Sequence, residues 1–415
     1  MLQSKGKMEI RGFDWGPNIT RLIIEFAEDT DRKTELKPEM FQVTEKRKDK
    51  GFPGEIDRKV SDVYFSDEFG NKDEETPNPG FITLDLELEI FKGFPFYMEG
   101  VPVNKWSRSL CVNVSLKEGF EILLKDGKSE KMADVNISLD EGKNPDSIYL
   151  PEIKNVSLDN KFTGSKGHTF SYASYCPKSA SNDNKRPLVI WIHGLGEGGN
   201  DPRICLYGNK VVSLVGEEFQ KIMGGAYVLV PQCPTYWMQY KEKMEWVFDN
   251  NGQDSIYLTD LKELIDDFVL SNYVDKDRII VGGCSNGGYM TMDLILNYPD
   301  YFAAAYPVCE AFIPDNLSYE KLAGIKNLPM WFVYAMNDGD VIPSKYEEPL
   351  LKRLKEMGCN YKLSLFEDVH DTSGKFFKDG EPLRYFGHWS WIYFFNNECF
   401  DNGISIWQWL SEQKK

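Results

Sequence analysis

Short runs in the first third of the chain alternate apolar and polar residues. In the clearest of them, residues 81–90, every second residue is apolar: Ile82, Leu84, Leu86, Leu88 and Ile90. A period of two predicts a half-buried β-strand. Residues 19–26 and 109–116 have the same character, and turn-rich or charged stretches separate the three runs. We therefore predict an antiparallel sandwich, followed by a polar linker over about residues 126–146.

The pattern changes after about residue 150. Continuous apolar runs replace the alternating ones, at residues 187–192, 226–230, 278–281 and 330–334. Continuous runs predict strands buried on both faces, as in a parallel sheet covered by helices. Residues 255–270 and 347–357 have apolar positions at helical spacing between these runs. The chain is thus predicted to hold an all-β domain over residues 1–145 and an α/β domain over residues 146–415.

Charge and composition exclude several classes of function and partner. The 415 residues include 48 Lys and Arg against 65 Asp and Glu, a formal charge of −17. Because nucleic acids and anionic membranes both attract basic surfaces, neither is an expected partner. No apolar run is long enough to span a bilayer, and residues 1–10 lack the apolar stretch of a signal peptide. None of the eight cysteines forms a C-x-x-C pair, so no structural zinc site is expected.

The strongest chemical signal is a G-x-S-x-G motif with Ser285 at its centre. It follows the strand predicted at residues 278–281 and opens a helix predicted at residues 286–298. A serine on a sharp strand-to-helix turn is the nucleophile elbow of a large class of hydrolases. Small residues are needed on both sides because the turn is tight and strained. We predict that Ser285 is a catalytic nucleophile.

A second glycine-rich turn, H-G-L-G-E-G-G, begins at His193 directly after the strand predicted at residues 187–192. In this position such hydrolases place half of an oxyanion hole. We expect one backbone N–H from Leu195 or Gly196 and the other from Asn286 to face the developing oxyanion. The run lacks the G-K-[ST] ending of a phosphate-binding loop. His193 is expected to brace the turn rather than to act as a base.

The acid and the base should follow the serine in the order Asp, then His. The loop after the strand at residues 330–334 offers Asp338 and Asp340. Asp338 is favoured because a D-x-x-V spacing with a following proline is typical of this loop. For the base, His388 in G-H-W-S-W is favoured over His370. His168, upstream of the core strands, is interpreted as a surface residue.

Substrate selection is expected in the long loop of residues 231–252, because loops at the carboxyl edge of a parallel sheet border the active site. Trp237, Tyr240 and Trp246 are candidates for an aromatic wall against a sugar ring or a cinnamoyl group. Packing of these rings onto the body of the domain is the alternative. Residues 310–327 are a candidate lid.

Together the motifs H-G-L-G-E-G-G, G-C-S-N-G-G-Y-M, N-D-G-D-V-I-P and G-H-W-S-W resemble bacterial α/β-hydrolase esterases of the prolyl-oligopeptidase and feruloyl-esterase-like branch. The chain most resembles the subgroup with an N-terminal immunoglobulin-like domain. The resemblance implies an α/β-hydrolase domain preceded by an immunoglobulin-like sandwich. It also implies a secreted or cell-associated serine esterase that uses Ser285, Asp338 and His388 through an acyl-enzyme.

The same resemblance suggests small or carbohydrate-linked esters of acetyl or feruloyl type as substrates, with no cofactor and no metal. A serine peptidase of the prolyl-oligopeptidase type is the alternative, although residues 1–145 are too few for a β-propeller of at least four blades. The N-terminal domain is a candidate surface for a homo-oligomer.

Overall fold

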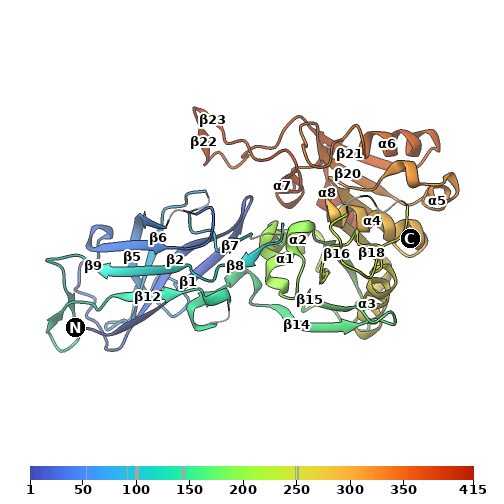
Figure 1. Cartoon of the computed structure of the whole chain (residues 1–415). Helices are drawn as coiled ribbons and strands as arrows, with labels where there is room; N and C mark the ends of the chain where they lie inside the picture. Colours follow the sequence, from blue (N-terminus) through green and yellow to red (C-terminus); the bar gives the residue numbers. More distant parts are fainter. Residues whose placement is uncertain (53, 91, 99–101, 143–144, 248, 250–251) are drawn as a thin grey trace. The chain divides into compact units, whose positions relative to one another are not determined.

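The computed structural model describes residues 1–52, 54–90, 92–98, 102–142, 145–247, 249 and 252–415 (Figure 1). The chain forms two compact units, Met1–Lys154 and Asn155–Lys415. The break lies nine residues beyond the boundary expected at residue 145, because strand β13 (Ile148–Tyr149) pairs in parallel with strand β1 (Ser4–Phe13) of the first unit.

Two main sheets build the first unit. The five-stranded sheet has the order β13-β1-β2-β6-β5, in which the further strands are β2 (Gly16–Phe26), β5 (Val60–Ser66) and β6 (Phe81–Leu86). The four-stranded sheet has the order β12-β9-β3-β4, made of β3 (Phe41–Lys46), β4 (Glu55–Arg58), β9 (Cys111–Leu116) and β12 (Val135–Ser138). Two short hairpins complete the strands: β7 (Phe96–Tyr97) with β8 (Lys105–Trp106), and β10 (Ile122–Leu123) with β11 (Ser129–Glu130).

The apolar faces of the two sheets pack against each other. Gly6 of β1 shows how closely they approach, since a Cβ atom there would lie 2.7 Å from Ile137 of β12. Two sequence expectations need correction here. The strand predicted at residues 81–90 ends at Leu86. The polar linker predicted at residues 126–146 is wrong, because it contains β12, whose Val135 and Ile137 are buried; residues 143–144 of that stretch lie outside the described part.

An eight-stranded mixed sheet forms the centre of the second unit. Its order is β14-β15-β17-β16-β18-β19-β20-β21, with β14 (Val156–Thr163) and β15 (Thr169–Tyr175) antiparallel at one edge. The remaining strands run parallel: β16 (Arg186–Ile192), β17 (Tyr227–Gln232), β18 (Val274–Cys284), β19 (Ala304–Val308), β20 (Met330–Ala335) and β21 (Tyr361–Phe366). The continuous apolar runs therefore do mark buried parallel strands.

Helices cover both faces of this sheet (Figure 1). One apolar cluster joins the sheet residues Leu188, Ile190 and Ile192 to α3 (Leu258–Ser271), α4 (Asn286–Asn297), α5 (Tyr319–Gly324) and α6 (Glu347–Glu356). On the other face, Trp191 stacks on Phe394 of α7 (Trp391–Phe395) and Trp331 contacts Trp409 of α8 (Ile406–Glu412). The shorter helices α1 (Pro202–Gly208) and α2 (Glu217–Ile222) lie between β16 and β17 in the chain.

The register of the parallel strands positions the candidate site. Ile192 at the end of β16 is paired with Gly283 near the end of β18. The turn that begins at His193 and the turn that holds Ser285 therefore leave the sheet side by side at its carboxyl edge. Among the described residues, no helix is both long enough and apolar enough to cross a membrane.

Candidate active site

Ser285 occupies the turn between β18 and α4 in a strained conformation. Its φ and ψ are 56° and −117°, a region that residues with a side chain rarely adopt. Such a backbone costs on the order of 1–3 kcal/mol and persists only where the surroundings enforce it. Here the Ser285 N–H donates to the Val308 carbonyl at 2.9 Å, and the Ser285 carbonyl accepts from Tyr289 N–H at 2.9 Å. The motif thus forms the sharp elbow that the sequence predicted.

The motif needs its glycines because neighbouring backbone atoms lie too close to leave room for a side chain. A Cβ atom on Gly283 would lie 2.3 Å from the Ile192 carbonyl oxygen, and one on Gly287 would lie 2.0 Å from the same atom. A Cβ atom on Gly288 would lie 2.7 Å from Glu310 Cα. Because backbone atoms cannot move aside as side chains do, these positions accept no larger residue. The elbow is thereby pressed against the end of β16.

His193 braces the neighbouring turn with both ring nitrogens. Nδ1 lies 2.6 Å from the Gly194 carbonyl, and Nε2 accepts from Cys233 N–H at 2.9 Å. Burial lowers the pKa of His193 to about 4, so the ring is neutral and its Nδ1–H donates to Gly194. The ring has no nitrogen left for a substrate, as the sequence suggested. Leu195 and Gly196 follow it, half-buried, at the start of the short turn Leu195–Glu197.

Trp237 ties the turn to the elbow. Its backbone N–H donates to Asn286 Oδ1 at 2.6 Å, and its indole N–H donates to the His193 carbonyl at 3.1 Å. The side chain has no exposed surface, so the predicted place of Trp237 in a substrate-facing wall does not fit. Trp237 stacks on Phe170 instead, which agrees with the alternative that its ring packs onto the body of the domain.

Tyr240 and Trp246, the other two aromatic candidates, are half-buried. Trp246 stacks on Tyr236 with ring centroids 5.0 Å apart, and Lys241 Nζ lies 4.9 Å from the Tyr240 ring. Both residues therefore keep some accessible surface. Residues 248, 250 and 251 of this loop lie outside the described part of the chain.

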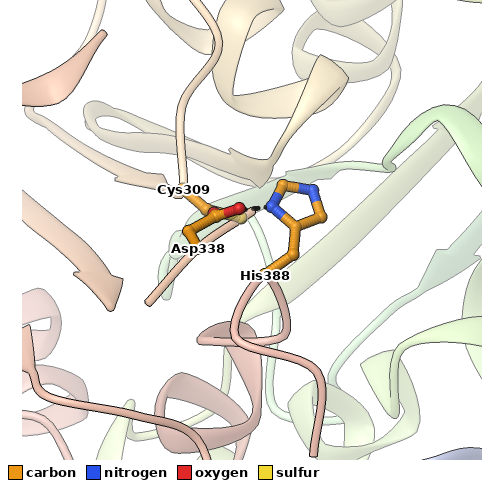
Figure 2. A group of neighbouring side chains, drawn as sticks. All are labelled: Cys309, Asp338 and His388. Carbon is orange, nitrogen blue, oxygen red and sulfur yellow. Dashed lines mark hydrogen bonds and ion pairs between the residues drawn. The ribbon is translucent and has the colours of Figure 1, made fainter. Parts of the chain in front are cut away.

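Asp338 and His388 form a direct pair (Figure 2). Asp338 Oδ2 lies 2.7 Å from His388 Nδ1, and Asp338 Oδ1 accepts from the N–H groups of Asp340 and Val341 at 2.9 Å each. Both side chains of the pair are buried, whereas Asp340 is exposed and contributes only its backbone. Three hydrogen bonds hold the Asp338 carboxylate in place, so the imidazole it orients has a fixed plane.

The other two histidines are engaged elsewhere. His370 pairs with Asp368 at 2.7 Å and its side chain is 41% exposed. His168 is not the surface residue that the sequence suggested, because its side chain is only 15% exposed and Nδ1 lies 2.8 Å from the buried Asp260 of α3. This pair fastens the turn between β14 and β15 to α3.

Three buried residues at the same edge were not among the site residues predicted from the sequence. Cys309 follows β19 with φ 36°, and its sulfur and single ligand atoms of Asp338 and His388 all lie within 4.8 Å of one another (Figure 2). Burial raises the pKa of the Cys309 thiol far above its usual range, so the free thiol carries its proton. Glu310 comes next in the chain, and Glu347 opens α6.

Burial also raises the pKa of Glu310, to about 8, although one of its oxygens accepts from Phe312 N–H at 2.6 Å. Burial, with the Glu310 charge second, raises the pKa of Glu347 to about 10. Both groups are therefore protonated at neutral pH. Only the position of Glu310, two residues beyond the end of a parallel strand, could have signalled it, because residues that follow such strands lie at the site edge.

Ser285 is connected to the Asp338 and His388 pair through one short segment. Its N–H is bonded to Val308, and the next residue, Cys309, is the one whose sulfur lies beside the pair. The sequence candidates for nucleophile, base and acid therefore lie at one edge of the sheet. Residues 310–327, the candidate lid, contain a 3-10 turn (Pro314–Asn316) and α5, with Leu317 and Leu322 buried.

Comparison with known proteins identifies two matching regions in the chain. Residues 9–131 match the model of an esterase Ig-like N-terminal domain, and residues 178–381 match that of the phospholipase/carboxylesterase family. A solved thermostable esterase is similar to the chain with a TM-score of 0.78, 24% identity and coverage of 99% of both chains. A ferulic acid esterase covers 52% of this chain with a TM-score of 0.40.

Among curated proteins, tabersonine synthase of Catharanthus roseus is 26% identical over 155 residues, which are 37% of this chain. The match spans 47% of that relative, so the chain covers about half of its length.

The fold is that of an α/β-hydrolase preceded by an Ig-like domain, as the sequence predicted. The chain therefore combines a region that matches an esterase Ig-like N-terminal domain with a region that matches the phospholipase/carboxylesterase family.

Proposed function

We propose that this protein is a serine carboxylesterase in which Ser285 is the nucleophile, His388 the general base and Asp338 the residue that orients the base. The observation that carries the proposal is the buried Asp338–His388 hydrogen bond of 2.7 Å at the same sheet edge as a strained elbow serine. A serine, an imidazole and a carboxylate in this arrangement make up the machinery of acyl transfer.

The reaction follows from the residue types. His388 Nε2 accepts the proton of Ser285 as the serine oxygen attacks the ester carbonyl carbon. Asp338 holds Nδ1–H and stabilises the imidazolium that forms. His388 then returns the proton to the leaving alcohol, which leaves an acyl-enzyme on Ser285. Water, deprotonated by the same imidazole, releases the acid and restores the serine.

The oxyanion would lie between two backbone N–H groups, that of Asn286 and that of Leu195 or Gly196. Asn286 is the first residue of α4, where free N–H groups and the positive end of the helix dipole meet. Its side chain is held by Trp237 N–H, so the peptide has little freedom to turn away. Loss of one donor from such a pair costs about 2.7–4 kcal/mol of transition-state stabilisation.

Small neutral esters, including acetyl or feruloyl esters linked to carbohydrate, are the proposed substrates. The net charge of −17 disfavours polyanionic substrates. The accessible surfaces of Tyr240 and Trp246 suit a flat aromatic acyl group or a sugar ring.

Substitution of Ser285 tests the reaction. Ser285→Ala should lower hydrolysis of p-nitrophenyl acetate by about 10⁴-fold or more, as removal of the nucleophile does in serine hydrolases. A fluorophosphonate should label the wild-type enzyme on Ser285 and leave the variant unlabelled. Ser181→Ala, at an exposed serine, is the matched control and should keep full activity. Turnover by Ser285→Ala within tenfold of wild type would contradict the assignment.

The same assay defines the substrate. Wild-type enzyme is compared on acetyl, butyryl, long-chain acyl and feruloyl esters, and on a proline-containing peptide anilide. Preference for the acetyl or feruloyl ester supports the proposed substrate class. Faster cleavage of the anilide would instead identify a peptidase.

A further inference from the structure

Cys309, Asp338 and His388 present three different metal-binding groups to one another. A thiol sulfur, a carboxylate oxygen and an imidazole nitrogen all lie within 4.8 Å, and all three residues are buried (Figure 2). Cys309 and Asp338 follow the ends of β19 and β20, and His388 lies in the loop before α7. The sheet therefore fixes the positions of Cys309 and Asp338. The reaction proposed above uses Asp338 and His388 but leaves the Cys309 sulfur without a role.

We propose that these three side chains form an inhibitory site for a soft or borderline divalent cation of the Zn²⁺ or Cd²⁺ type. Thiolate and imidazole are the ligands such cations prefer, whereas Mg²⁺ and Ca²⁺ select oxygen. Three protein ligands and one open position match the usual coordination of non-structural zinc sites. The inhibitory effect rests on the proposed role of His388; the binding site does not.

The Asp338–His388 pair needs only a small rearrangement, and the Cys309 sulfur starts within 4.8 Å of both ligand atoms. Bonds of about 2.0–2.1 Å to nitrogen and oxygen in a tetrahedral site place these two ligands about 3.4 Å apart. Asp338 Oδ2 and His388 Nδ1 are now 2.7 Å apart, so the pair must open by roughly 0.7 Å, a value that follows from the same geometry. Asp338 would keep both backbone hydrogen bonds at Oδ1 while Oδ2 turns to the ion.

The proton transfers that accompany metal binding predict its effect on catalysis. The Cys309 thiol loses its proton to solvent as sulfur binds the ion. The lone pair of Nδ1 must also face the ion, so the proton on Nδ1 moves to Nε2 of the same ring. His388 then carries Nε2–H, which cannot accept the proton of Ser285. The ion therefore blocks the base without touching the serine, and its removal restores the original tautomer.

Inhibition and binding are measured on the full-length enzyme. Zn²⁺ should inhibit ester hydrolysis by wild-type enzyme, and a chelator should restore the rate, whereas Mg²⁺ should have no effect. In Cys309→Ser the half-inhibiting Zn²⁺ concentration should rise at least about tenfold, with each variant scored against its own metal-free rate. Cys399→Ser removes another fully buried thiol and should keep the wild-type response. Equal inhibition of wild type and Cys309→Ser would overturn the proposal.

A binding measurement separates the site from the reaction. Cd²⁺ added without substrate should give an ultraviolet thiolate-to-metal absorption band that wild-type enzyme and Ser285→Ala share and that Cys309→Ser lacks. Asp338→Asn keeps the thiol and the side-chain shape, and should weaken the Cd²⁺ response by at least about tenfold. A band that is unchanged in both Cys309→Ser and Asp338→Asn would exclude the site. Activity retained by Ser285→Ala would refute the reaction and leave the Cd²⁺ result to stand on its own.

Discussion

The two units differ in how they hold some of their buried carboxyl groups. In the first unit the buried carboxylates face guanidinium groups: Glu45 lies 2.9 Å from Arg58, and Asp49 lies 2.6 Å from Arg47. In the second unit both oxygens of the buried Glu347 and one oxygen of Glu310 have no hydrogen-bond partner among the described residues. The first unit neutralises its buried carboxylates with cations, whereas the second neutralises these two with protons.

This difference distinguishes the first unit, a scaffold, from the second unit, which holds the proposed reaction centre. Removal of one partner from a buried ion pair leaves an uncompensated buried charge, so the pair helps to hold together the strands that carry it. A protonated carboxyl can be ionised, and here Glu310 directly follows Cys309, which lies beside the proposed base. We infer that the second unit is sensitive to the protonation state of Glu310. The first unit is sensitive only to the geometry of its buried ion pairs.

The largest expected effect is at the oriented imidazole. Asp338→Asn should lower kcat for p-nitrophenyl acetate by about 10⁴-fold, because an amide stabilises the wrong tautomer of the base and cannot balance its charge. The unfolding temperature should change little, since the amide oxygen still accepts from the backbone. Asp340→Asn, on the exposed neighbour, is the matched control and should remain active. A small loss in Asp338→Asn with a large one in Asp340→Asn would reverse the assignment.

The next effect concerns the scaffold. Arg58→Met leaves the Glu45 carboxylate buried without its cation and should lower the free energy of unfolding by about 3–5 kcal/mol. The double variant Arg58→Met with Glu45→Leu should recover most of this loss, since an apolar pair replaces the ion pair. Urea unfolding followed by tryptophan fluorescence measures both.

Lys5→Met, which breaks the exposed pair with Glu25, serves as the control and should unfold as wild type does. Ester hydrolysis should be unaffected in all folded variants. Equal stability of Arg58→Met and wild type would show that the first unit does not depend on its buried ion pair.

Taken per pH unit, the smallest effect is a pH dependence of stability. The pKa of Glu310 is raised from 4.5 to about 8 in the fold, so its contribution to stability is fully present below about pH 4.5 and is lost as the pH rises through about 8. Between these limits wild type should lose up to about 1.4 kcal/mol per pH unit relative to Glu310→Gln, which cannot ionise. Thermal unfolding from pH 5 to pH 8 measures the difference. Glu348→Gln, exposed on α6, should follow wild type; parallel curves for Glu310→Gln and wild type would remove Glu310 from this role.

Much of the α/β domain was predictable because buried parallel strands leave long apolar runs. The elbow, the turn at His193 and the Asp338–His388 pair follow from motif and chain order. Strand β12 was missed because four alternating residues in polar surroundings give too weak a signal, and β14 because half of its side chains are exposed. Cys309, Glu310 and Glu347 were not predicted at the site, since one sequence does not reveal which thiols and carboxyls a fold brings together at a sheet edge.

The approach of the elbow to Ile192 has a practical meaning for directed evolution. In a randomised library that includes positions 283, 287 and 288, nearly all variants would be unable to form the elbow. Any Cβ atom at these positions would lie less than 3 Å from a backbone atom. Positions 240 and 246 carry accessible rings on a loop outside the sheet. Diversity placed at these two positions would test their proposed role in substrate preference while the elbow remains intact.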